Sequence, residues 1–104
     1  MAAYLIIRAK VNEEARQAFD EWYQSEHLPE ALQDFKGTSA MRGWSDVEEN
    51  VHLAFYEFPT LVAANKLLGS ELMQDFIKEF DRHWKGKVTR TREVFEIKQL
   101  LLAK

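Results

Sequence analysis

The amino-acid sequence predicts an α+β domain in which one four-stranded antiparallel sheet carries helices on a single face. Short β-branched and apolar segments alternate with stretches whose apolar residues recur every three or four positions. Their order is strand, helices, strand, strand, helices, strand. The chain of 104 residues, 46% hydrophobic and 30% charged, has the length and composition of one globular domain covering residues 1–104.

In the first half of the chain, the apolar and β-branched residues 3–9 predict a strand. Asn12 is expected to cap the amphipathic helix that follows. Pro29 lacks an N–H group and disfavours helical backbone at the residue before it, so this helix should end or kink near His27. A second short helix then covers residues 28–35.

Gly37 should end that second helix. The remaining predicted elements are strands at residues 38–45 and 51–58, helices that end at Gly69 and Gly86, and a last strand at residues 87–99. The longest of these helices has the most regular apolar stripe, and Phe76 lies in its middle.

Two split βαβ units in this order give a ferredoxin-like fold, βααββααβ, with the first and third strands in the middle of the sheet. Residues 4–7 and 51–58 fit central strands because both of their faces are apolar. Helices cover only one face, so the other would expose a large apolar patch. A second copy of the chain is the expected cover, which predicts a homodimer through the sheet faces. The alternative is a monomer with an exposed amphipathic face.

Composition excludes several functional classes. The chain has no Cys, which excludes disulfides, thiolate zinc sites and cysteine nucleophiles. Its net charge of −3 argues against a nucleic-acid-binding protein. No apolar run is long enough for a membrane span, and the N-terminus does not resemble a signal peptide, so a cytoplasmic protein is expected. The three His, at positions 27, 52 and 83, lie on separate predicted elements, and no metal site is expected.

His27 is the most informative residue for chemistry. Tyr23 lies four residues earlier, on the same helical face, and Pro29 interrupts the helix beside both. An imidazole transfers protons near neutral pH, so His27 could act in acid/base catalysis. The alternative is that His27 is a cation that stabilises the negative end of the helix dipole.

The stretch F-x-x-W-x-x-x-x-H-x-P, at residues 19–29, lies within a doubled βααβ chain of about 100 residues. This combination resembles the dimeric α+β barrel superfamily, and the EthD-like and stress-responsive barrel families in particular. Members include cofactor-independent oxygenases of polycyclic aromatics, lactone isomerases, haem-degrading enzymes, aldoxime dehydratases and proteins with no known activity. In EthD-like proteins the helix-ending His lies in a cleft between helices and sheet, so the resemblance implies that His27 is a catalytic acid/base. The Asn, Trp and His set of haem-degrading members does not map onto this chain, and no cofactor is expected.

Strand parity supplies further candidates for ligand binding. His52 and Tyr56 share one face of the third strand, and Arg42 and Trp44 share one face of the second. These four side chains suit a flat organic ligand with an oxygen function, and Tyr23 or Tyr56 would orient that oxygen. They equally suit a dimer seam, because parity does not show which face meets the helices, and we favour the seam.

The last strand carries basic residues, including Arg90 and Arg92. They could bind an anion, but a solvated edge strand protected by charge is the favoured interpretation. The sequence as a whole predicts a small homodimeric ligand-binding barrel whose acid/base chemistry acts on an aromatic or polyketide-like molecule. The alternatives are a non-catalytic ligand-binding or stress-related module of the same fold and a purely structural dimerisation domain.

Overall fold

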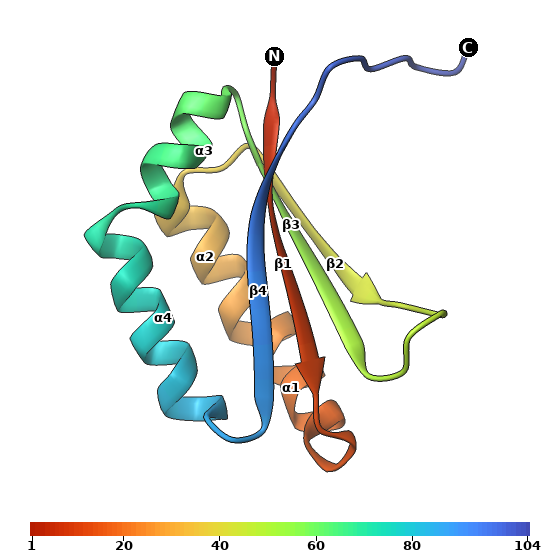
Figure 1. Cartoon of the computed structure of the whole chain (residues 1–104), viewed down its shortest axis with the longest axis vertical. Coiled ribbons are helices and arrows are strands. Elements are labelled where there is room, and N and C mark those ends of the chain that lie inside the picture. The colour runs from red at the N-terminus through yellow and green to blue at the C-terminus, as the bar shows by residue number, and fades with distance from the viewer.

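The computed structural model describes all 104 residues and has the predicted architecture. One antiparallel sheet, with strand order β2-β3-β1-β4, carries all the helices on one face (Figure 1). The strands are β1 (Ala3–Val11), β2 (Ser39–Trp44), β3 (Val51–Phe58) and β4 (Val88–Glu96). The helices are η1 (Glu13–Ala15), α1 (Arg16–Trp22), η2 (Tyr23–His27), α2 (Leu28–Phe35), α3 (Leu61–Leu68) and α4 (Glu71–Trp84). The ferredoxin-like class and the central places of β1 and β3 are therefore confirmed.

The sequence predicted that the first long helix ends or kinks near His27, and the structure shows that it does not end there. It continues from α1 through the π-helical turn η2 into α2. In η2 the N–H of Leu28 donates to the carbonyl of Tyr23, five residues earlier. A π-turn shifts the hydrogen-bond register by one residue, so the helix passes the missing donor of Pro29 without ending.

Two of the predicted helix ends differ in detail. The Asn12 side chain does not cap a helix; its amide donates to the carbonyl of Gly86 at 3.5 Å. Helix α2 ends at Phe35, and the next residue, Lys36, caps it in the left-handed conformation with φ 59°. Gly37 is needed for a different reason, because a Cβ there would lie 2.9 Å from the carbonyl oxygen of Glu57.

Burial along β3 shows which face of the sheet meets the helices. Ala54, Tyr56 and Phe58 are almost fully buried, as is His52 at 1% exposure. The favoured placement of His52 and Tyr56 at a dimer seam is therefore wrong: they pack under the helices.

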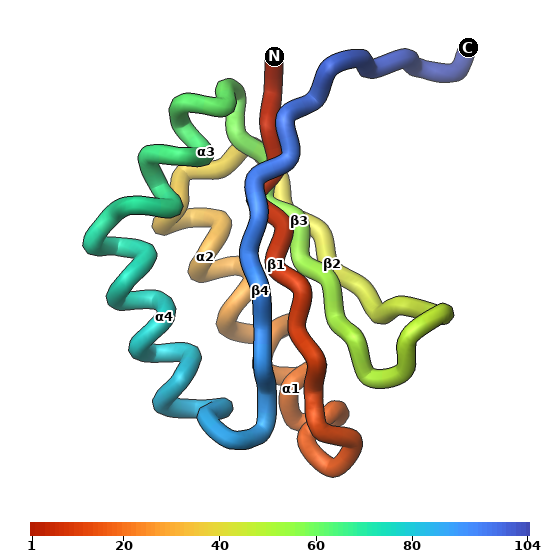
Figure 2. The backbone as a smooth tube through the Cα atoms, viewed as in Figure 1, coloured from red at the N-terminus to blue at the C-terminus, as the bar shows by residue number.

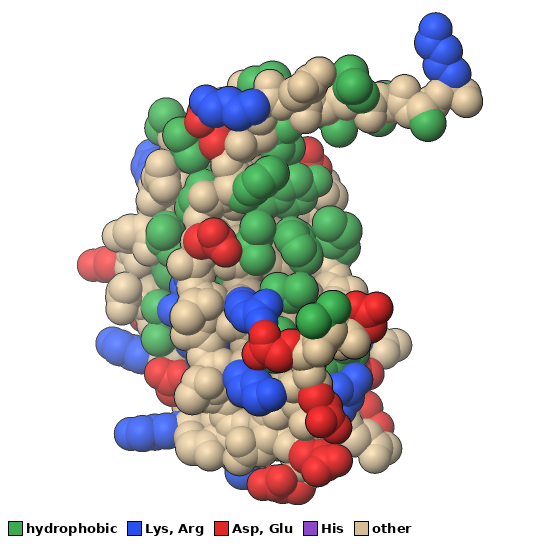
Figure 3. Space-filling model, turned by 45° about the vertical axis from the view of Figure 1, so that its right-hand side comes forward, with side chains coloured by type: hydrophobic (Ala, Val, Ile, Leu, Met, Phe, Trp, Pro, Cys, Tyr) green, Lys and Arg blue, Asp and Glu red, His purple; other side chains and the backbone are tan.

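The opposite face of the sheet has no helix over it. Side chains there include Tyr4, Met41, Phe55 and Phe95, of which Met41 and Phe95 are more than half exposed. Hydrophobic side chains gather in the upper part of this side of the molecule and charged ones in the lower part (Figure 3). Residues beyond β4 extend away from the sheet (Figure 2). None of the helices combines the length and hydropathy that a membrane-spanning helix needs.

Candidate functional site

The π-helical turn places Tyr23 and His27 side by side. Their ring centroids are 4.7 Å apart and nearly perpendicular. His27 also stacks on Trp22, with centroids 4.5 Å apart and the planes inclined by 17°. Packing on two sides fixes the imidazole in one orientation, as a proton-transferring group requires.

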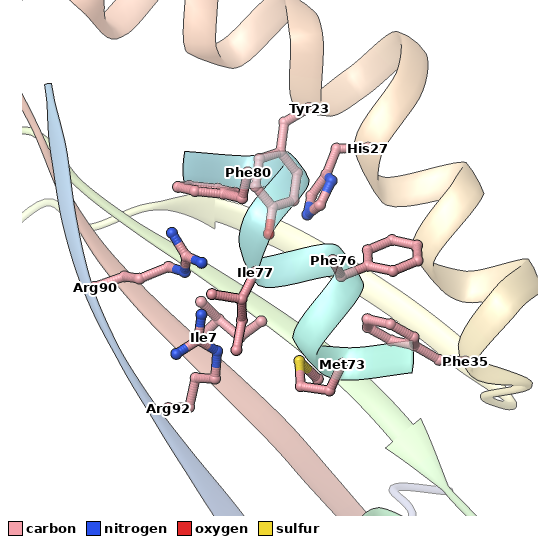
Figure 4. A pocket seen from close by; sticks show the side chains of 10 residues that line it. All are labelled: Ile7, Tyr23, His27, Phe35, Met73, Phe76, Ile77, Phe80, Arg90 and Arg92. Atoms are coloured by element: carbon pink, nitrogen blue, oxygen red, sulfur yellow. The ribbon is translucent and has the colours of Figure 1, made fainter. Parts of the chain in front are cut away.

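These two side chains border a small cavity between the helices and the sheet (Figure 4). Its volume is about 20 Å³, which is room for one or two water-sized groups. Seven of the ten lining residues are hydrophobic, and no carboxylate is among them. The lining consists of Ile7, Tyr23, His27, Phe35, Met73, Phe76, Ile77, Phe80, Arg90 and Arg92.

A second, larger groove lies on the solvent side of His27. It has a volume of about 360 Å³ and runs between η2, the start of α2, and α4. Unlike the cavity, it is acidic: its lining includes Glu26, Glu30, Asp75 and Glu79. His27 and Phe76 belong to both linings, so this pair separates the inner cavity from the outer groove.

Burial sets the protonation state of His27. Removal from water, reinforced by the positive charge of Arg90, lowers the pKa of His27 to about 4. The imidazole is therefore neutral at neutral pH and has one nitrogen lone pair available. A neutral imidazole can accept a proton, and the lowered pKa makes His27 a weaker base than a free imidazole. The alternative of a helix-end cation does not fit the structure, because the helix continues past His27 into α2.

On the side away from the cavity, Tyr23 packs against two side chains of β3. Its hydroxyl lies 3.4 Å from the hydroxyl of Tyr56, and its ring centroid lies 4.5 Å from that of His52. Burial raises the pKa of Tyr23 to about 12 and also raises the pKa of Tyr56, so both phenols keep their protons. Tyr56 and His52 support Tyr23 and do not line the cavity.

Arg42 and Trp44 are held by Asp20 of α1, a residue that the sequence did not single out. The carboxylate accepts hydrogen bonds from Arg42 Nη1 and Trp44 Nε1, both at 2.8 Å. These donors, Arg42 first, lower the pKa of Asp20. Arg42 Nη1 also lies 3.2 Å from His52 Nε2. Because a guanidinium only donates, that nitrogen of His52 accepts, and the ring is neutral.

Burial, helped by the charge of Arg42, lowers the pKa of His52 to about 4. The cluster of Asp20, Arg42, Trp44 and His52 thus forms one connected unit beneath α1. It adjoins Tyr23 but takes no part in the cavity lining. The ligand-binding roles assigned to Arg42, Trp44 and His52 stay predictions, and the structure shows them in contact with each other and with Asp20.

Arg90 and Arg92 are cavity residues that the sequence assigned to a solvated edge strand. Both point from β4 toward the helices, on the same strand face as Val88 and Val94 (Figure 4). That alternation was a signal in the sequence: two arginines between two valines at every second position share the inner face of a strand.

No family model matches this chain, and neither does any curated protein. Solved structures do. A protein from Deinococcus radiodurans described as a candidate antibiotic biosynthesis monooxygenase is 12% identical over 98% of both chains, with a TM-score of 0.69. SnoaB, a cofactor-independent oxygenase from Streptomyces nogalater, is 12% identical over 96% of both chains, with a TM-score of 0.64.

An EthD family protein from Bacillus halodurans is 17% identical, with a TM-score of 0.63. The match covers 89% of this chain and 97% of that protein. At these identities the likeness concerns the fold. The chain has the ferredoxin-like α+β fold of these proteins, as the sequence resemblance predicted.

Proposed function

We propose that this protein is a homodimeric barrel that binds an aromatic or polyketide-like molecule and removes a proton from it without a cofactor. The observation that carries the proposal is the position of His27: a neutral imidazole, fixed by two aromatic rings, at the border of a largely apolar cavity. The same fold in SnoaB, a cofactor-independent oxygenase, supports this class of chemistry.

The proposed step needs only groups that the chain supplies. A ring nitrogen of His27 takes a proton from an acidic C–H or O–H group of the ligand, and the bonding electron pair stays on the ligand as an enolate or phenolate. The protonated Tyr23 hydroxyl borders the same cavity and can donate a hydrogen bond to that oxygen. Tyr56 and His52 hold Tyr23 in place from behind.

A cavity of about 20 Å³ admits one or two small groups, so an aromatic ring enters only when side chains move. Phe76 is the side chain best placed to do so, because it is half-buried and separates the cavity from the outer groove. Met73, a flexible and unbranched side chain, lines the cavity beside it. We therefore place ligand entry on the groove side, past Phe76.

The homodimer is proposed from the uncovered face of the sheet. Tyr4 and Phe55 pack edge to face there at 6.2 Å, and Phe95 and Met41 extend the apolar surface. A second copy presents the same face and covers it isologously. The exposed leucines at positions 100–102 follow β4 in the sequence and would add apolar surface to such a seam.

Two measurements test the proposal. Native mass spectrometry of the purified protein should show a dimer of about twice 12.2 kDa with a bound organic molecule of low mass. Turnover of the molecule so identified then separates catalysis from binding alone. A monomer at micromolar concentration would contradict the barrel, and a ligand that is bound but never converted would favour the non-catalytic module.

A further inference from the structure

Two arginines of β4, Arg90 and Arg92, line the cavity and give it positive charge. We infer that the cavity binds an anionic oxygen of its ligand, a carboxylate or an ionised enol, and that Arg92 is the residue that anchors it. The aromatic part of this ligand rests on the function proposed above, whereas the anion site rests on the unpaired Nε–H of Arg92 and on the charges that line the cavity.

Arg92 is a charged side chain without a protein partner. Its Nε–H is buried and has no hydrogen-bond acceptor. No salt bridge of the protein involves Arg92. A buried donor left without an acceptor is costly, and for Arg92 this donor is the Nε–H of a half-buried side chain. An anion in the cavity would supply the missing partner.

Arg90, two residues earlier on the same strand face, provides the contrast. Its Nη1 bonds Asp81 at 3.2 Å, and its guanidinium lies 3.7 Å from the ring centroid of Phe80. Arg90 is thus already paired and adds positive charge to the cavity, while Arg92 keeps a free donor. A guanidinium binds a carboxylate or an enolate oxygen through directed N–H groups, which Arg92 can still offer.

The distribution of charge around His27 agrees with this assignment. The inner cavity contains two guanidinium groups and no carboxylate, while the carboxylates lie along the outer groove. Figure 4 shows both arginines reaching from β4 into the space that Tyr23 borders. Removal of a proton by His27 would leave negative charge on the ligand, and Arg92 would stabilise it where it forms.

The direct test is an NMR titration of the full-length protein with formate, a carboxylate small enough for the cavity, and with formamide, its neutral counterpart. Formate should shift the Nε–H resonance of Arg92 with saturation, and formamide should not. Arg82, which is 73% exposed, is the matched internal control and should show no saturating shift. No saturating shift with formate, or the same shift with formamide, would overturn the anion site.

A second arm uses aromatic probes on the unaltered protein and on Arg92→Gln, with Arg82→Gln as the control variant. Benzoate should bind about 10- to 100-fold more tightly than benzamide, the ratio expected for one charge-assisted hydrogen bond. Arg92→Gln should abolish that ratio and Arg82→Gln should keep it. Lawsone, an acidic hydroxynaphthoquinone, and its neutral methyl ether test an ionised enol in the same way and separate it from a carboxylate.

The outcomes separate the two proposals. Equal binding of benzoate and benzamide, and of lawsone and its ether, would overturn the anion site and leave the aromatic ligand standing. Saturable formate binding at Arg92 with no aromatic binding would support the anion site and contradict the aromatic ligand. If Arg92→Gln does not fold, the charged and neutral pairs on the unaltered protein still decide.

Discussion

Acidification should destabilise this protein through two histidines, the half-buried His27 and the buried His52. In the unfolded chain each imidazole takes up a proton as the pH falls through 6.5, whereas in the folded protein it stays neutral until about pH 4. The unfolded state therefore binds more protons between these values, and the free energy of unfolding falls with the pH. The contribution is complete above pH 6.5 and is lost as the pH approaches 4.

A fall of the pKa from 6.5 to about 4 corresponds to about 3 kcal/mol for each histidine. That is a large share of the roughly 5–15 kcal/mol that stabilises a typical domain. Asp20, which contacts the His52 cluster, stays ionised throughout because its hydrogen bonds lower its pKa. The window between pH 4 and 6.5 therefore reports on the histidines and not on this carboxylate.

The assay is urea unfolding, followed by tryptophan fluorescence, at neutral pH and at about pH 4.5. His27→Gln and His52→Gln should each reduce the loss of stability between these two conditions. His83→Gln removes a histidine whose side chain is 40% exposed and serves as the control. Equal pH dependence in all four proteins would refute the reasoning, since it would mean that neither imidazole is held neutral by burial.

Two further predictions concern packing. Phe80→Ala should cost about 3–5 kcal/mol of unfolding free energy, because Phe80 is 4% exposed and contacts Phe19, while Phe76→Ala should cost less because Phe76 is only half-buried. Chemical denaturation of both variants checks this. Equal losses of unfolding free energy would contradict the deeper burial of Phe80. Gly37→Ala should destabilise the protein by forcing the added Cβ against the carbonyl of Glu57, and a thermal midpoint equal to that of the unaltered protein would show that this contact relaxes freely.

The fold could be predicted from the sequence because apolar residues recur at different spacings in its strands and in its helices. Residues 4–7 and 51–58 are apolar on both faces, which agrees with the central places that the βαβ topology gives their strands. The response of the helix to Pro29 could not be predicted in the same way. A missing N–H marks where a hydrogen bond is lost, but it does not determine whether the helix ends there or widens into a π-turn.

The site was predicted in part. Tyr23 and His27 are close in sequence, so helical spacing was enough to bring them together. The side of the sheet on which Tyr56 lies could not be predicted. Alternation along a strand only separates its two faces, and it does not show which of them the helices cover. Arg90 and Arg92 were misassigned for a similar reason: charge on an edge strand is usually solvated, and only the fold of α4 over β4 encloses them.

The most direct test of the central claim is the turnover of the identified ligand by His27→Gln beside the unaltered protein. With the dimer and the fold intact, the rate should fall by about 10²- to 10⁴-fold, the usual contribution of a general base. The unaltered protein should keep any such activity down to about pH 4, where His27 becomes protonated. A variant that converts the ligand at the original rate would contradict the assignment of His27 as the base.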